Sequence, residues 1–150
     1  MKLNNIDKII GSGFYSGFVP FAPGTMGSLV ALGIYLIPGF ETPIIHLGLI
    51  LIVTVWGISI SDKFDKFYGK DPKQCVIDEF AGTWISLFLV PKEFVLILTA
   101  FIIWRILDIT KPWPANRLEN LKGGLGIMMD DIASGIYTFI IMHIIIYFTN

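Results

Sequence analysis

Long apolar stretches alternate with short polar segments along the chain, and five of these stretches carry apolar residues on every side of a helix. A helix without a polar face lies either in a large protein core or in a membrane. Turn-forming residues separate the stretches at Pro38-Gly39, Pro91, Pro112 and Gly123-Gly124. The pattern therefore predicts an all-α fold, a compact bundle of about five hydrophobic helices over residues 26–40, 44–60, 80–90, 94–107 and 132–148.

The length and composition of the chain indicate a single integral membrane domain covering residues 1–150. Hydrophobic residues make up 54% of the sequence and charged residues 15%, and the mean hydropathy is +0.71. A soluble domain usually contains about 25% charged residues. Several of the apolar stretches are shorter than the roughly 20 residues that cross a bilayer. Their helices must extend into flanking motif residues, or one of them must be half-buried or re-entrant.

Basic residues are distributed unevenly between the segments that separate the apolar stretches. With a cytoplasmic N-terminus and five crossings, the inside regions are 1–25, 61–79 and 108–131. Ten of the eleven Lys and Arg residues lie in these regions or, for Arg105, at the inner end of the fourth stretch, which leaves Lys92 outside. This asymmetry follows the positive-inside rule. The motif loops are therefore expected to gather at the cytoplasmic face.

Charge and metal-ligand content exclude several classes of function. The net charge of -1 provides no broad basic surface, so nucleic acid is not an expected partner. The single cysteine, Cys75, cannot form an internal disulfide, and with only two histidines the chain lacks the ligands for a zinc site. His46 and His143 lie within apolar stretches and are expected to serve packing or hydrogen bonding between helices. Any metal ion is expected to bind through oxygen.

Acidic residues cluster at the inner ends of three apolar stretches. Asp78 and Glu79 open the third stretch, Asp108 closes the fourth, and Asp130 and Asp131 open the fifth. One interpretation is that these acids cap helix N-termini, where a carboxylate accepts backbone N–H bonds. Capping does not explain paired acids or an acid at a helix C-terminus, whereas a shared cation explains both. Carboxylate ligands favour Mg²⁺ or Ca²⁺, and Mg²⁺ commonly binds one or two carboxylates together with substrate phosphate and water.

A Gly- and Pro-rich loop over residues 11–28 leads into the first apolar stretch. Thr25 is placed to cap the helix that follows. The loop can present backbone N–H groups and the hydroxyl groups of Thr25 and Ser28 to an anion. The equally weighted alternative is a rigid interfacial turn. The loop matches no standard phosphate-binding pattern.

Arg105, Asp108 and Lys111 recur at intervals of three residues and are expected to share one face of a helix that Pro112 ends. On such a face the acid can bind a metal ion while the two cations bind substrate phosphate. The alternative is that Arg105 and Lys111 only neutralise Asp108. Both interpretations can hold, because an ion pair of the resting protein can reorganise when metal binds.

Four segments of the chain, in the same order, resemble the phosphatidylglycerophosphatase A family of bacterial membrane enzymes. They are GSGFYSGFVPFAPGTMGS, GKDPKQCVIDEFAGTWISL, RILDITKPWPANRLE and GGLGIMMDDIASGIY, and the resemblance covers most of the chain. It implies Mg²⁺-dependent hydrolysis of the phosphate monoester of phosphatidylglycerophosphate at the cytoplasmic face of the bacterial inner membrane, giving phosphatidylglycerol and inorganic phosphate. The phospholipid substrate and membrane lipids are then the expected partners. The residues that match the motifs of the family are the acids Asp78, Glu79, Asp108, Asp130 and Asp131 and the basic residues Lys70, Arg105 and Lys111.

The residues and the resemblance together predict an all-α membrane phosphatase of phospholipid biosynthesis with Mg²⁺ as cofactor. The expected metal ligands are Asp78, Glu79, Asp108 and Asp130, Asp131 is expected to support them or act as a base, and the expected substrate-binding residues are Thr25, Ser28, Lys70, Arg105 and Lys111. A covalent aspartyl-phosphate route is the mechanistic alternative. The functional alternative is a small membrane transporter or channel subunit with a carboxylate cation site. The oligomeric state is left open.

Overall fold

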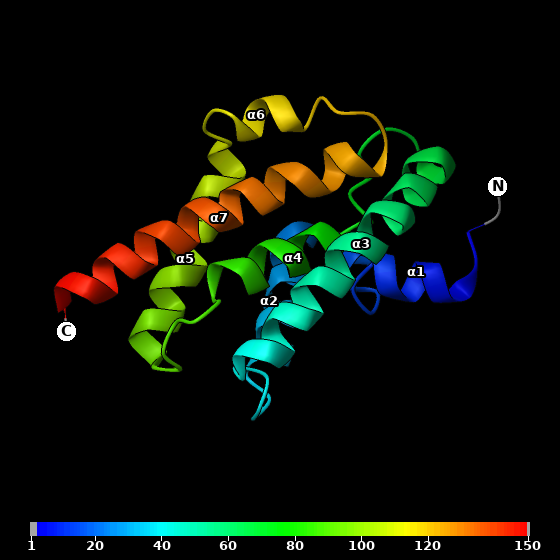
Figure 1. The fold of residues 1–150 in the computed structure, drawn as a ribbon. Coiled ribbons are helices and arrows are strands. Elements are labelled where there is room, and N and C mark those ends of the chain that lie inside the picture. The colour runs from blue at the N-terminus through cyan, green and yellow to red at the C-terminus, as the bar shows by residue number, and fades with distance from the viewer. Residues whose placement is uncertain (1–2, 150) are drawn as a thin grey trace.

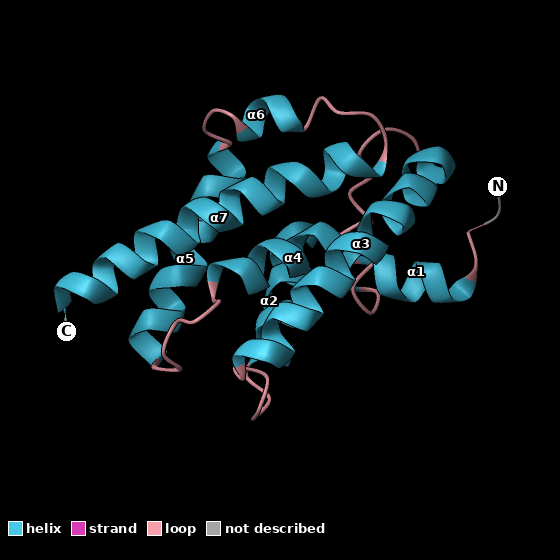
Figure 2. Cartoon of the chain, viewed as in Figure 1, coloured by secondary structure: helices cyan, strands magenta, loops and turns pink. Residues whose placement is uncertain are grey.

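The structure, a computed structural model, describes residues 3–149 and contains helices and loops but no strand over this range (Figures 1 and 2). The expected all-α bundle is therefore confirmed. The five predicted hydrophobic helices correspond to α2, α3, α4, α5 and α7. The elements in chain order are α1 (Asn5–Gly11), the 3₁₀ turn η1 (Ser16–Phe18), α2 (Pro23–Tyr35), α3 (Pro43–Tyr68), α4 (Ile77–Ser86), α5 (Phe94–Thr110), α6 (Ala115–Leu118) and α7 (Gly124–Thr149).

The start of α7 differs from the prediction and moves two candidate site residues. The helix begins at Gly124 rather than near Ile132, so Asp130 and Asp131 lie inside it instead of opening it. Glycine is a poor helix former, but here it permits close packing. A Cβ at residue 124 would meet the carbonyl oxygen of Ile58 on α3. The capping interpretation is therefore wrong for these two acids.

The start of α2 also differs from the prediction. Pro23 occupies the first helical turn, where its fixed φ suits the helix, and Ala22 is the cap residue with a φ of 45°. The prediction that Thr25 caps this helix is therefore wrong. Thr25 lies in the first turn, where its hydroxyl can contact a neighbouring helix.

α4 is the central helix of the bundle and contacts α2, α3, α5 and α7 (Figure 1). Trp84 on α4 donates from Nε1 to the Ala31 carbonyl on α2 at 2.9 Å. Gly135 on α7 approaches so closely that a Cβ there would meet the carbonyl oxygen of Gly82 on α4. Small residues at such a crossing let two helix backbones pack directly. These contacts position the first turn of α4, which carries two of the predicted acids.

The two histidines have structural roles, as expected. His46 Nε2 on α3 lies 2.8 Å from the carbonyl oxygen of Trp84 on α4, and the imidazole is buried among aromatic rings. His143 Nδ1 lies 2.8 Å from the carbonyl oxygen of Phe139, one turn earlier in α7. His46 therefore joins two helices, whereas the bond of His143 stays within one helix.

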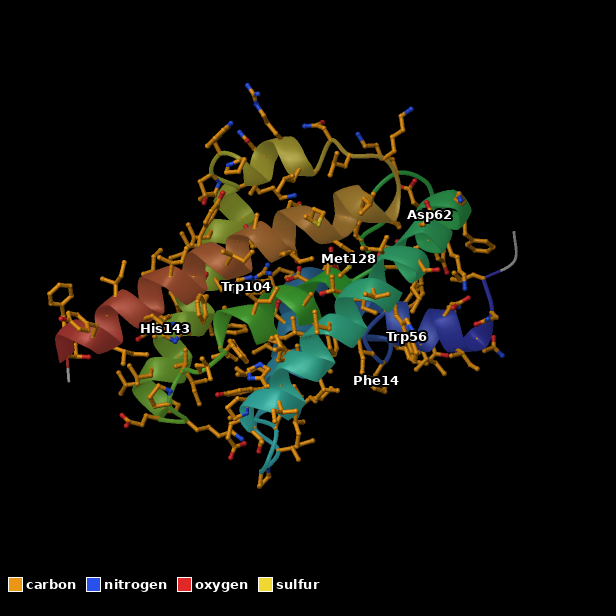
Figure 3. All side chains as sticks on the ribbon, in the orientation of Figure 1. Phe14, Trp56, Asp62, Trp104, Met128 and His143 are labelled. Atoms are coloured by element: carbon orange, nitrogen blue, oxygen red, sulfur yellow. The ribbon has the colours of Figure 1, made fainter. Side chains whose placement is uncertain are left out.

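Two helices within residues 3–149 are long and apolar enough to cross a membrane, namely α3 and α7 with 26 residues each. Exposed apolar side chains on these helices, such as Ile144 on α7 and Trp56 on α3, suit contact with lipid. Trp56 points outward from the bundle (Figure 3). α4 has only 10 residues. Its length of about 15 Å is half the roughly 30 Å hydrocarbon thickness of a bilayer. α4 alone is therefore too short to cross, and the chain covers the distance between the two ends of the bundle only together with the loops that flank α4.

The chain nevertheless alternates between two ends of the bundle. At one end the loop after α2 contacts the loop after α4. Lys92 Nζ lies 2.7 Å from Glu41 Oε2 and 3.1 Å from the carbonyl oxygen of Ile37. At the other end lie α6 and the loops that follow α3 and α5 (Figure 1). The motif loops are gathered at this second end, as predicted.

We expect residues 66 and 92 to be accessible from opposite sides of the membrane, since they lie at opposite ends of the bundle. In intact cells, a membrane-impermeant thiol reagent should label Lys92→Cys, whereas Lys66→Cys should be labelled only after the cells are opened. The unsubstituted protein is the control, because its one thiol, Cys75, is buried. Labelling of both variants from the same side would contradict this topology.

Candidate active site

A polar cavity of about 630 Å³ opens at the charged end of the bundle. It lies where the starts of α4 and α7 meet the ends of α3 and α5 (Figure 1). Seven of the ten predicted site residues line it among the described residues: Asp78, Glu79, Asp108, Asp130, Asp131, Lys70 and Lys111. Of the other three, Ser28 and Arg105 contact lining acids directly, and Thr25 contacts Arg105. The sequence-predicted residues therefore converge on one site.

Arg105 on α5 is the central cation of the site. Its Nη1 lies 2.5 Å from Glu79 Oε2 on α4 and 2.9 Å from Asp108 Oδ2 one turn along α5. The side chains of all three residues are largely buried. Arg105 and Asp108, three residues apart in the sequence, thus form an ion pair within α5. The pair of Arg105 with Glu79 joins α5 to α4. Charge-assisted hydrogen bonds in such a shielded place are among the stronger polar contacts of proteins.

The hydroxyl groups of Thr25 and Ser28 belong to the same network. Ser28 Oγ donates to Glu79 Oε2 at 2.8 Å, and Arg105 donates to Ser28 Oγ at 3.2 Å and to Thr25 Oγ1 at 3.5 Å. Gly24, one residue before Thr25, has no room for a Cβ because it would meet Glu79 Oε1. The loop and first turn of α2 therefore pack directly against the ion pair. A phosphate contact by Thr25 and Ser28 stays a prediction.

Lys111 pairs differently from the prediction. One of the two interpretations had Lys111 neutralise Asp108, but its Nζ lies 2.6 Å from Asp130 Oδ2 on α7 and 2.8 Å from Glu119 Oε2. The reason is local: α5 ends at Thr110, and Lys111 has a φ of 43°, which turns it away from the helix face that carries Asp108. Partial burial alone lowers the pKa of Lys111, but the hydrogen bonds to Asp130 and Glu119 outweigh it and raise the pKa.

Several carboxyl groups of the cavity are buried without full compensation of their negative charge. Asp130 Oδ1 and Asp131 Oδ2 are buried and accept no hydrogen bond from the described residues. Desolvation, followed by the charge of Glu79, raises the pKa of Asp78 well above its usual range. Desolvation, followed by the charge of Asp108, raises the pKa of Glu79 to about 7. The cavity is therefore short of positive charge, because uncompensated buried carboxylates are costly.

The donor atoms of this cavity fit a hard divalent cation such as Mg²⁺. All the acids offer oxygen, and the unpartnered oxygens of Asp130 and Asp131 are available to a cation. Within residues 3–149, no group of three or more His, Cys, Asp or Glu side chains is already arranged around one point where a metal ion could bind. Arg105 and Lys111 hold three of the acids in ion pairs. Metal binding therefore requires these carboxylates to turn away from their cations.

Glu119, Lys73 and Lys122 line the cavity but were not predicted to do so. They lie in polar segments between the apolar stretches, and such residues are typical of any solvated loop. The one feature of the sequence that could have identified two of them is their position: Glu119 ends one of the four motif segments, and Lys73 lies within another. The pairing of Glu119 with Lys111 depends on how the chain folds back after α5, which no local pattern specifies.

Cys75 lies next to the acidic segment and lines the cavity, yet it is not a nucleophile. Its Sγ is buried and lies 3.3 Å from Ser61 Oγ. Burial raises the pKa of the thiol, and a protonated thiol is a poor nucleophile.

Comparison with known proteins identifies close relatives of this chain. The family model described as phosphatidylglycerophosphatase A matches residues 9–146. A Bacteroides thetaiotaomicron protein named "Putative phosphatidylinositol-3-phosphatase" is 42% identical over 142 residues, which cover 89% of each chain. Two proteins named phosphatidylglycerophosphatase A, from Escherichia coli and Haemophilus influenzae, are 34% and 35% identical, covering 97% and 98% of this chain and 86% and 93% of their own lengths. No solved structure matches the chain significantly.

We expect Arg105→Gln to lower the free energy of unfolding by about 3–5 kcal/mol, because it leaves Glu79 and Asp108 buried without their counter-ion. Denaturant unfolding in detergent micelles measures this. The matched control is Lys66→Gln, which removes the cation of an exposed pair with Asp62 and should change the free energy by less than about 1 kcal/mol. Equal stability of the two variants would show that the Arg105 network does not hold the helices together.

Proposed function

Because the chain belongs to the phosphatidylglycerophosphatase A family and is therefore a phosphoric monoester hydrolase, we propose that it hydrolyses phosphatidylglycerophosphate to phosphatidylglycerol and inorganic phosphate in phospholipid biosynthesis. One observation carries the proposal. Acids from α4, α5 and α7 line one cavity, and two of them, Asp130 and Asp131, have buried oxygens without a partner among the described residues. A cavity with this composition suits a cation that accompanies an anionic phosphate.

Mg²⁺ is the cofactor that we propose for this cavity, held by Asp78, Glu79, Asp108 and Asp130. When bound, it would polarise the phosphoryl oxygens and lower the pKa of a coordinated water. The supporting features are the all-oxygen donor set and the deficit of positive charge around the acids. Asp78 and Glu79 occupy the first turn of α4, so packing of this central helix positions half of the proposed ligands.

Arg105 and Lys111 are the residues that we propose to bear the negative charge of the phosphoryl group. Both are paired with carboxylates of the cavity in the resting structure. When those carboxylates turn toward a metal ion, the two cations become available to phosphate oxygens. Asp131 is proposed to accept the proton of the attacking water through its unpartnered oxygen. In the covalent alternative an aspartate attacks phosphorus directly, and acid quenching during turnover would then trap a phosphorylated enzyme.

Family membership decides between the two functional classes that the sequence left open. The chain is a hydrolase, so the small transporter or channel subunit is set aside. The position of the cavity agrees, because it lies at one end of the bundle rather than along its length.

A second candidate substrate comes from the Bacteroides relative named as a phosphatidylinositol-3-phosphatase. At 42% identity it is more similar to this chain than the two phosphatidylglycerophosphatases are. Phosphatidylinositol 3-phosphate is also a phospholipid with a phosphate monoester on its headgroup. The chemistry of the cavity suits either lipid, so their relative rates of hydrolysis decide between them.

The proposed location is the inner membrane of a bacterium, with the cavity facing the cytoplasm. The relatives are bacterial, and two helices of the described chain are apolar and long enough to cross a membrane. The cytoplasmic orientation rests on the distribution of Lys and Arg along the sequence.

The direct test is phosphate release by the purified protein in detergent micelles. We expect release from phosphatidylglycerophosphate in the presence of Mg²⁺, with loss of activity in EDTA and recovery when Mg²⁺ is restored. Faster release from phosphatidylinositol 3-phosphate would make that lipid the substrate. Undiminished release in EDTA would contradict the metal-dependent mechanism.

We expect Asp78→Asn, Asp108→Asn and Asp130→Asn each to lower kcat/KM by roughly 100-fold or more and to raise the Mg²⁺ concentration needed for activity, because each removes a metal ligand. A double variant should be little worse than the poorer single variant, since residues of one catalytic unit are not additive. Glu93→Gln, an acid exposed at the other end of the bundle, is the control. Retained activity in two of the three folded variants would exclude a shared site.

Thr25→Val should lower kcat/KM without changing the Mg²⁺ requirement, because it removes a proposed phosphate contact and no metal ligand. Thr110→Val is the matched control: this exposed hydroxyl near the cavity donates only to the Ile106 carbonyl, at 2.7 Å. Steady-state kinetics on folded protein distinguish the outcomes. If both variants keep the same kcat/KM as the unsubstituted protein, Thr25 serves only packing.

A further inference from the structure

The charged side chains that line the cavity differ in exposure. The acids that we propose to work on the reacting phosphate lie deep, and Asp130 and Asp131 are each only 4% exposed. Three lysines line the mouth instead and are exposed, namely Lys70, Lys73 and Lys122. The buried charges that line the cavity are therefore carboxylates, whereas the exposed ones include three ammonium groups beside Asp71 and Glu119.

The three lysines at the mouth differ from the deeper cations in having no partner. Lys111 and Arg105 are held by carboxylates of the site. Lys70, Lys73 and Lys122, in contrast, form no ion pair or side-chain hydrogen bond within residues 3–149, although Asp65, Asp71 and Glu119 also line the cavity. Their charges are thus available to a ligand in the resting structure.

Two ordered loops hold these lysines at the end of α3. In the first loop, which carries Lys70 and Lys73, the Asp71 N–H donates to Asp65 Oδ1 at 3.0 Å, and the Cys75 N–H donates to the Pro72 carbonyl at 2.9 Å.

The second loop carries Lys122 and reaches α3 through the glycine that follows this lysine. Gly123 has a φ of +62°, and a Cβ there would meet the carboxylate of Asp62 on α3. Only glycine combines this backbone conformation with so close an approach. Both loops therefore bring their lysines to one rim of the cavity.

We propose that Lys70, Lys73 and Lys122 form a second anion subsite, which binds the phosphodiester that links the headgroup of the substrate to its diacylglycerol. This rests on the proposed function. Both candidate substrates carry two phosphates, a terminal monoester that is cleaved and a diester nearer to the lipid tails. With the monoester among the deep acids and their metal ion, the diester lies toward the mouth, where the unpaired ammonium groups are.

The subsite has a consequence for specificity. A soluble phosphate monoester can occupy only the deep position, so the three lysines do not increase its binding affinity. A phospholipid with both phosphates contacts both positions and is held more tightly. The rim lysines thus select a two-phosphate lipid headgroup without contacting the reacting phosphorus.

The test uses the full-length protein in nonionic detergent micelles, where no other anionic lipid is present. Calorimetry measures the Kd for phosphatidylglycerophosphate, kinetics measure KM and kcat, and inorganic phosphate serves as a competitive inhibitor that fills only the deep position. The variants are Lys70→Gln, Lys73→Gln, Lys122→Gln and the triple variant. Arg117→Gln is the matched control, because Arg117 is an exposed cation at the same end of the bundle but does not line the cavity.

For each lysine variant we expect Kd and KM for the lipid to rise by up to about fivefold, and for the triple variant by at least about tenfold, with kcat and the inhibition constant of inorganic phosphate nearly unchanged. An unchanged Kd, or an equal loss for inorganic phosphate, would overturn the subsite. So would an equal effect of Arg117→Gln, or a loss confined to vesicles rich in anionic lipid, because both indicate general attraction to a charged surface. If the lipid binds but no phosphate is released, the proposed function fails while the Kd comparison still decides the subsite.

Discussion

The guanidinium group of Arg105 lies where carboxylates are buried inside an otherwise apolar bundle. It contacts Glu79 on α4, Asp108 on α5 and the hydroxyls of Ser28 and Thr25 on α2. Without this cation, the two carboxylates would have to bind protons or admit water, and both outcomes would loosen the junction of the three helices. The position of the first turn of α4, and with it the geometry of the cavity, therefore depends on one shared positive charge.

The resting ion pairs also prepare the site for its ligands. Arg105 and Lys111 pair with four acids of the cavity, yet Asp130 and Asp131 still keep unpartnered buried oxygens. A divalent cation supplies the missing positive charge, and a phosphate monoester supplies the negative charge that the released Arg and Lys require. Metal and phosphate are thus expected to bind together more tightly than either alone, because the charges exchange partners.

The sequence was sufficient to predict the class of the fold and many of the residues that line the candidate site. Uninterrupted apolar stretches predicted all five main helices, and the spacing of Arg105 and Asp108 predicted their ion pair. Predictions from the local sequence pattern were wrong at positions where contacts between distant segments determine the structure. Gly124 was expected in a turn, but packing against α3 makes it the first residue of α7. Lys111 was expected on one helix face with Arg105 and Asp108, whereas its left-handed backbone directs it to Asp130. Contacts between distant segments, such as Glu79 with Arg105, have no local signal.

The central claim is that acids from three separate helices form one divalent metal site. Mn²⁺ is a hard ion that commonly replaces Mg²⁺ on oxygen ligands, and its free form is quantified directly by electron paramagnetic resonance. Titration of the purified protein with Mn²⁺, in the absence of substrate, therefore measures metal binding without relying on turnover. We predict saturable binding that is competed by Mg²⁺ and is strongly weakened when Asp78, Asp108 or Asp130 is replaced by Asn. Binding that is equally tight in all three variants, or absent from the unsubstituted protein, would contradict a shared metal site.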